Sequence, residues 1–154
     1  MFSVSADHTL RVWGDGPVAP LRRTYCARTR FHALAFSPDG KRLAVACDNG
    51  VVQVLEWAQD RVPPIELRHD SPVRTLAWSD DGATLWTGVA GAPATGGETS
   101  KHAAIVQWRV ADGRTLRTIP QSAPIEGLVL GRGGHFLAAS SGDSTVRVYA
   151  LAPD

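Results

Sequence analysis

Three stretches of the chain repeat one pattern, and this repetition limits the fold more than any other feature. Residues 31–40 read FHALAFSPDG, residues 73–82 read VRTLAWSDDG, and residues 125–134 read IEGLVLGRGG. Each stretch is followed by a short apolar run and then, after a polar turn, by a second apolar run. The glycines that end the three stretches are 42 and 52 residues apart. Periods of this length predict repeated units that bury their apolar faces against their neighbours.

The apolar runs alternate with polar residues at a period of two, which is typical of strands that bury one face. Residues 9–13 (TLRVW), 52–55 (VQVL) and 145–149 (TVRVY) show this alternation. The turns at 37–40 (SPDG) and 79–82 (SDDG) end on glycine, where a tight turn favours positive φ. The sequence therefore predicts an all-β chain.

Aligning the repeats predicts up to four strands in each. Within the repeats the first strands are expected at 31–36, 73–78 and 125–130, the second at 42–47, 84–89 and 136–141, the third at 51–57, 104–110 and 145–151, and the fourth at 65–68 and 115–119. Before them, strands are expected at 2–5, 10–13 and 21–25. The resulting repeats span residues 1–26, 27–68, 69–119 and 120–154 of a single partial domain.

The segments at 36–54 (FSPDGKRLAVACDNGVVQV) and 3–13 (SVSADHTLRVW) resemble the WD40 repeat family, and the resemblance covers essentially the whole chain. The family implies a β-propeller, in which four-stranded sheets called blades are arranged around an axis. We therefore expect an incomplete WD40-like β-propeller, with two full four-stranded blades flanked by two partial blades. Ser-Pro-Asp-Gly turns also occur in the propellers of the TolB protein and of prolyl oligopeptidase-like enzymes, which is the rival propeller type.

The resemblance also implies a buried polar network in each blade. In the family it links a histidine before the first strand, a hydroxyl on the second, an aspartate in the next turn and a tryptophan on the third. The tetrad-like positions are Ser3, Asp7 and Trp13 in the first repeat, Asn49 in the second, His69, Thr87 and Trp108 in the third, and Asp143 and Tyr149 in the fourth. No repeat holds a complete tetrad, and Gln121 stands at the histidine position of the fourth.

One insertion departs from the repeat. Residues 90–103 (AGAPATGGETSKHA) lie between the second and third strands of the third repeat. By resemblance, this end of a propeller commonly binds partners, so Lys101 and His102 are candidate contact residues; an idle surface loop is the alternative. Trp86 is a further candidate for partner contact if it is exposed, and otherwise a packing residue between blades.

Several function classes have no support in the sequence. We expect no catalytic residues, no metal site and no cofactor, because the nucleophile, phosphate-loop and zinc motifs are absent. The net charge of +1 gives no overall field for nucleic acid, and no apolar stretch is long enough for a membrane span. The first residues lack the apolar run of a leader. We therefore expect a cytoplasmic protein.

The sequence predicts a non-catalytic WD40-repeat scaffold that mediates protein–protein interaction and forms the C-terminal part of a larger propeller. An open array of blades exposes strand edges and apolar faces, which favours self-association or pairing with a missing propeller half. Closure into a four-bladed ring is the structural alternative. The alternative function is a regulatory propeller remnant of a multidomain bacterial enzyme such as a kinase or protease, and a propeller hydrolase is a third hypothesis.

Overall fold

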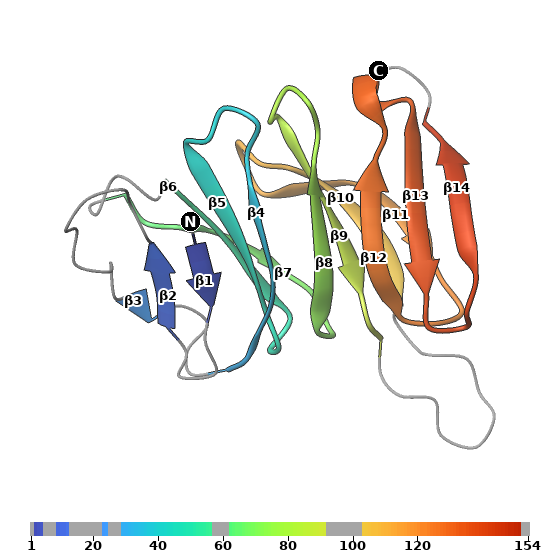
Figure 1. The fold of residues 1–154 in the computed structure, drawn as a ribbon, viewed down its shortest axis with the longest axis horizontal. Helices are drawn as coiled ribbons and strands as arrows, with labels where there is room; N and C mark the ends of the chain where they lie inside the picture. Colours follow the sequence, from blue (N-terminus) through green and yellow to red (C-terminus); the bar gives the residue numbers. More distant parts are fainter. Residues whose placement is uncertain are drawn as a thin grey trace.

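The structure, a computed structural model, consists almost entirely of antiparallel strands (Figure 1). It describes residues 29–56, 62–91 and 103–151 in full, and residues 2–4, 9–12 and 23–24 as backbone only. The strands are β1 (Phe2–Val4), β2 (Thr9–Val12), β3 (Arg23–Thr24), β4 (Phe31–Phe36), β5 (Arg42–Cys47), β6 (Val51–Glu56), β7 (Ile65–Arg68), β8 (Val73–Trp78), β9 (Thr84–Val89), β10 (Ala104–Arg109), β11 (Arg114–Pro120), β12 (Ile125–Leu130), β13 (Phe136–Ser141) and β14 (Val146–Ala150). A short 3-10 turn, Arg132–Gly134, joins β12 to β13. The predicted all-β fold is confirmed.

The strands form four separate sheets in chain order, as the blades of a propeller do. In the described part of the chain, two four-stranded sheets, β4–β7 and β8–β11, stand between two three-stranded sheets, β1–β3 and β12–β14. Within each sheet, every strand pairs antiparallel with the strand next to it in the sequence. Figure 1 shows the four sheets side by side, so every sheet has a face that can pack against the next one.

The β4–β5 and β8–β9 turns are stabilised by the Ser-x-Asp-Gly residues that repeat in the sequence. The Ser79 hydroxyl donates to Oδ1 of Asp81 at 2.6 Å and accepts the backbone N–H of Thr84 at 2.9 Å. Gly82 ends the turn at a φ of +67°, a conformation that side chains with a Cβ rarely adopt. The equivalent bond in the preceding blade joins Ser37 to Asp39, also at 2.6 Å. The repeated Ser-x-Asp-Gly sequence thus fixes the end of each of these two blades.

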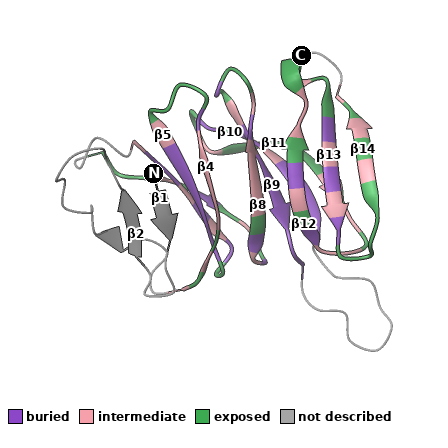
Figure 2. Ribbon diagram, viewed as in Figure 1, coloured by how far each residue is buried: buried purple, intermediate pink, exposed green. Residues whose placement is uncertain are grey.

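The core lies between the sheets. Each of the two boundaries of the β8–β11 sheet with its neighbouring sheets has its own apolar cluster. Between β4–β7 and β8–β11 the cluster includes Ala44, Val52, Val54, Val73, Trp78 and Leu85. Between β8–β11 and β12–β14 it includes Trp86, Ile105, Ile125, Leu128 and Leu137. Figure 2 shows the buried residues concentrated on inner strands such as β5, β9 and β13. Packing between sheets is therefore what holds the array together.

Polar contacts also cross from one sheet to the next. The indole N–H of Trp78 donates to the backbone carbonyl of Ala35 at 3.0 Å, and the guanidinium of Arg42 lies 5.2 Å above the Trp78 ring. Arg42 also donates to the carbonyl of Gly82 at 2.8 Å. These contacts fix the β4–β7 and β8–β11 sheets relative to each other.

The outer face of the β12–β14 sheet is apolar and uncovered. Val129, Ala138 and Val148 are directly paired across the three strands. Val129 is 67% exposed and Val148 is 66% exposed; Val146, at 70%, and Phe136, at 55%, are also exposed. Figure 2 shows the exposed stretches of β14 at the end of the array. We call Val129, Phe136, Val146 and Val148 the terminal apolar face.

The same register positions in the β4–β7 sheet are covered by a neighbour. There the paired row is Ala35, Ala44 and Val54, and all three belong to the cluster that packs on β8–β11. The terminal apolar face is therefore the equivalent of a surface that is buried between sheets elsewhere in the chain.

Candidate functional site

Three of the residues at tetrad-like positions come together within one blade. His69 follows β7, Thr87 lies in β9 and Trp108 lies in β10. The indole N–H of Trp108 donates to Oγ1 of Thr87 at 3.1 Å, and Nε2 of His69 lies 2.9 Å from the same oxygen. The His69 and Trp108 rings also meet edge to face, with centroids 4.9 Å apart. Thr87 is fully buried, so its single hydroxyl serves both neighbours away from water.

The backbone fixes the protonation of His69. Its Nδ1 lies 3.0 Å from the carbonyl oxygen of Gly50, which can only accept, so Nδ1 carries the proton. In the neutral ring, Nε2 is then free to accept the Thr87 hydroxyl proton. Burial lowers the pKa of His69 below its usual value, because desolvation disfavours the charged ring. The bond to Gly50 also ties β8–β11 to the turn of the preceding blade.

A different polar cluster occupies the fourth repeat. The Tyr149 hydroxyl donates to Oε1 of Gln121 at 3.1 Å, and Arg147 donates to the same oxygen at 3.3 Å. Arg147 also donates to Oδ2 of Asp143 at 2.8 Å, while Oδ1 accepts the N–H of Thr145 at 3.0 Å. Hydrogen bonds from the Thr145 hydroxyl and from Arg147 hold the pKa of Asp143 well below its usual range. The structure therefore brings Asp143 and Tyr149 into one network through Gln121 and Arg147.

The other candidate residues are not brought into such a network in the described part of the chain. Asn49 accepts the backbone N–H of Val51 at 3.2 Å through Oδ1, which stabilises a turn. Ser3 lies in β1, where only the backbone is described, paired with Arg11. The remaining candidates lie outside the described residues, namely Asp7, Trp13, Lys101 and His102.

The described end of the insertion at 90–103 lies beside the His69 and Trp108 side chains. Ala103, at its end, lines a cavity of about 440 Å³ together with His69, Trp108 and Gln121. The residues at 92–102 are outside the described part of the chain, so the contacts of the two predicted loop residues remain a prediction.

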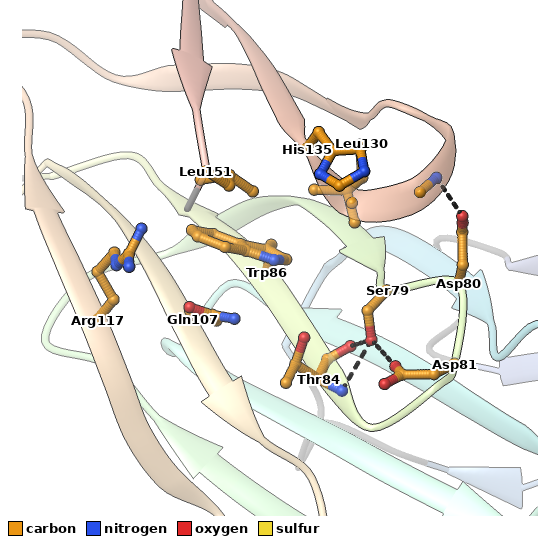
Figure 3. A pocket seen from close by; sticks show the side chains of 12 residues that line it. Ser79, Asp80, Asp81, Thr84, Trp86, Gln107, Arg117, Leu130, His135 and Leu151 are labelled. Carbon is orange, nitrogen blue, oxygen red and sulfur yellow. Dashed lines mark hydrogen bonds between the residues drawn. The ribbon is translucent and has the colours of Figure 1, made fainter. Parts of the chain in front are cut away.

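A second cavity lies between the β8–β11 and β12–β14 sheets, at the opposite end of the blades (Figure 3). Its volume is about 350 Å³, within the range of sites that hold small ligands or a few side chains. Trp86 lies at its base, with Leu130 and Leu151 on the opposite wall. Trp86 is only 2% exposed and packs in the cluster between the sheets, so it is not the exposed anchor that was one of its two predicted roles.

This cavity, which we call the inter-blade cleft, carries opposite charges at its two ends. Figure 3 shows Asp80 and Asp81 at one end and Arg117 at the other, with Trp86 between them. Oδ2 of Asp80 accepts the backbone N–H of Gly133 at 2.7 Å, which joins the two sheets. The hydrogen bond from Ser79, and then one from the N–H of Ala83, lowers the pKa of Asp81 below its usual value. Both carboxylates are therefore fixed by neighbours from the turns.

The register of the sheet explains why Arg117 faces the cleft. Trp86 pairs with Gln107, and Gln107 pairs with Arg117, so all three share one face of the β8–β11 sheet. Neither Arg117 nor His135, which also lines the cleft, was predicted as a site residue from the sequence. The alternation around Trp86 was the available signal, but the pairing of β10 with β11 was needed to use it.

The described residues contain neither a metal cluster nor a membrane-spanning helix. Among them, no three histidine, cysteine, aspartate or glutamate side chains are grouped so that they could hold a metal ion. Nor does the described part of the chain contain a helix with the length and apolar character of a membrane span.

The separate antiparallel sheets have the arrangement of propeller blades, and the His69–Thr87–Trp108 network has the pattern expected of a WD40 blade. The family described as "WD domain, G-beta repeat" matches residues 21–55 and 113–150, so these two segments carry WD40 repeats. It is 26% identical over 136 residues to Protein HIR1 of Gibberella zeae, a match that covers 77% of this chain and 12% of that protein. It is 26% identical over 164 residues to the Chromatin assembly factor 1 subunit FAS2 homolog of Oryza sativa subsp. japonica, covering 96% of this chain and 30% of that protein. Protein HIR1 of Candida albicans is 24% identical over 157 residues, covering 86% of this chain and 16% of that protein.

These relatives correct one prediction and leave another without support. A chromatin assembly factor acts on chromatin, which lies in the nucleus, so the prediction of a cytoplasmic protein is wrong. The alternative function, a regulatory remnant of a bacterial kinase or protease, finds no support in these relatives. The chain spans between about an eighth and a third of the length of these three curated relatives.

Proposed function

We propose that this chain is a non-catalytic WD40 scaffold that binds protein partners during chromatin assembly in the nucleus. The observation that carries the proposal is the match to a chromatin assembly factor subunit over 96% of the chain. Stacked blades with inter-sheet hydrogen bonds supply a rigid platform, and the turns and clefts at the blade ends supply specificity. The proposal concerns the WD40 region alone, because the match covers 30% of that relative.

The charge distribution favours protein over nucleic acid as the partner. Nucleic-acid surfaces present unpaired basic side chains that neutralise phosphates. In the described part of the chain, several arginines at or near the surface are paired with carboxylates: Arg68 with Glu66, Arg109 with Asp112, and Arg147 with Asp143. The net charge of +1 agrees with this mixed surface.

The protein is expected to keep its partners when nucleic acid is destroyed. The full protein that contains this chain would be tagged in its own cells, isolated from nuclei with and without nuclease, and its partners identified by mass spectrometry. We expect nuclear recovery and retention of histones or histone-depositing subunits after nuclease treatment. Exclusion from the nucleus, or loss of these proteins with the nucleic acid, would refute the proposed function.

We further propose that the terminal apolar face packs against another WD40 blade, supplied either by the rest of a propeller or, in the isolated chain, by a second copy. Register equivalence with Ala35, Ala44 and Val54, which are packed against the adjacent sheet, supports this packing. A contiguous apolar face of this kind is uncommon on the surface of a soluble monomer.

The purified chain is expected to self-associate as its concentration rises, and Val129→Lys with Val148→Lys should shift it to monomer in sedimentation velocity. The two lysines place charge in the middle of the apolar row, where it would be desolvated by a packed blade. Leu116→Lys is the matched control, since Leu116 is also an exposed apolar strand residue, on β11 and outside this face. Unmodified chain that stays monomeric at every concentration would contradict the proposal.

A further inference from the structure

We propose that the inter-blade cleft binds an extended protein segment that carries a basic and an acidic residue, separated by two or three residues that include an apolar one. This inference rests on the proposed scaffold function, because it specifies the kind of partner segment that the platform takes. It is carried by the shape of the cleft and by the placement of opposite charges at its ends.

The acidic end can accept the basic residue of such a segment without rearrangement. Asp80 uses Oδ2 for the N–H of Gly133, and Asp81 uses Oδ1 for Ser79 and Ala83. The other oxygen of each carboxylate takes part in none of these bonds and can accept from an ammonium or guanidinium. Because the turns already hold both side chains in place, binding costs little side-chain ordering.

The opposite end offers a cation that the described residues do not neutralise. Arg117 is exposed on the outer strand β11, next to Gln107 in the register. Arg109 and Arg147 each contact a carboxylate, whereas Arg117 has no such partner among the described residues. A carboxylate from a bound segment would supply that partner, with bidentate geometry available to the guanidinium.

The middle of the cleft is apolar and separates the two charged ends. The Trp86 ring faces Leu130 and Leu151 across the cleft (Figure 3). Arg117 on β11 lies two strand spacings, or about 10 Å, from Trp86 on β9, and Asp81 lies beyond the start of β9 in the turn. An extended segment of about four residues with long charged side chains can therefore reach both ends. An apolar side chain placed between the two charged residues would therefore lie against the Trp86 side of the cleft.

The test uses three four-residue peptides, each capped and carrying the same neutral dye, with binding measured by fluorescence anisotropy. Their sequences are Lys-Leu-Ala-Glu, Lys-Leu-Ala-Lys and Glu-Leu-Ala-Glu. We expect the first peptide to bind the chain most tightly. Arg117→Glu should lower the affinity for Lys-Leu-Ala-Glu about fivefold. The same variant should bind Lys-Leu-Ala-Lys most tightly of the three peptides. Asp81→Asn, which keeps the Ser79 bond, should weaken only the lysine-containing peptides.

Arg114→Glu is the matched control, because it makes the same charge change on the same strand at a residue that does not line the cleft. Equal effects of Arg114→Glu and Arg117→Glu, or no preference among the three peptides, would overturn the inference. The outcome is separable from that of the nuclear isolation. Peptide selectivity without chromatin-assembly partners would refute only the proposed function, and partners without peptide selectivity would refute only the cleft.

Discussion

Trp86→Ala is expected to lower the free energy of unfolding by about 3–5 kcal/mol, which is at the upper end of what a single core substitution costs. Trp86 is buried between the β8–β11 and β12–β14 sheets, in the cluster with Ile105, Leu128 and Leu137. Truncation leaves a void where two sheets meet, and the sheets can close it only by shifting against each other. Urea unfolding followed by far-ultraviolet circular dichroism would measure the change.

Two further variants make this result interpretable. Trp86→Phe keeps an aromatic ring in the cluster and should cost clearly less than alanine, so it remains measurable if Trp86→Ala does not fold. Lys41→Ala, at an exposed turn position away from the terminal apolar face, should change stability by less than about 0.5 kcal/mol. If Trp86→Ala were as stable as Lys41→Ala, the sheets would not be packed as described.

Thr87→Val is expected to cost about 2–4 kcal/mol, although valine has nearly the same shape as threonine. The substitution removes the oxygen that accepts the Trp108 indole N–H and that lies next to Nε2 of His69. Both partners then remain in a buried site without that bond, and each unsatisfied group costs about 1–3 kcal/mol. The same urea titration, at neutral pH where the His69 ring is neutral, would measure it.

The network itself can be isolated by comparison with variants that keep or remove one bond. Thr87→Ser retains the hydroxyl and should lose less stability than Thr87→Val. Trp108→Phe should cost less in the Thr87→Val background than in the unmodified chain, because the shared bond is already gone. Additive costs for Thr87→Val and Trp108→Phe would show that these two side chains are not energetically linked.

Much of the strand pattern could be predicted because it depends on local signals. The Ser-x-Asp-Gly turns and the alternating runs located β8 and β9 at the same residues in the sequence and in the structure. Alternation could not decide which way Trp86 faces, since it assumes one buried and one exposed face. In the middle sheets both faces are covered, and neighbouring residues such as Leu85 and Trp86 are both buried.

The candidate sites were predictable only where a repeat supplied the residues. The His69, Thr87 and Trp108 positions followed from alignment with a known pattern, and the structure brings these three side chains together. The inter-blade cleft has Asp80 at one end and Arg117 at the other, and these residues line one cavity only because a turn and the outer strand of one blade both face the next blade. In the sequence, an aspartate in a turn and an arginine on an edge strand are both common at exposed positions. Neither residue alone therefore indicates a cleft.

The hydrogen bond from the N–H of Gly133 to Asp80 connects two blades at the edge of the inter-blade cleft. The Asp80 carboxylate both borders the cleft and accepts the N–H of Gly133 from the adjacent blade. An occupant that binds its other oxygen therefore contacts a group whose position depends on the angle between the two blades. Occupancy of the cleft and the angle between the two blades are then thermodynamically linked. A partner that changes this angle would change the affinity for the occupant by the same free energy with which the occupant changes the preference for that angle.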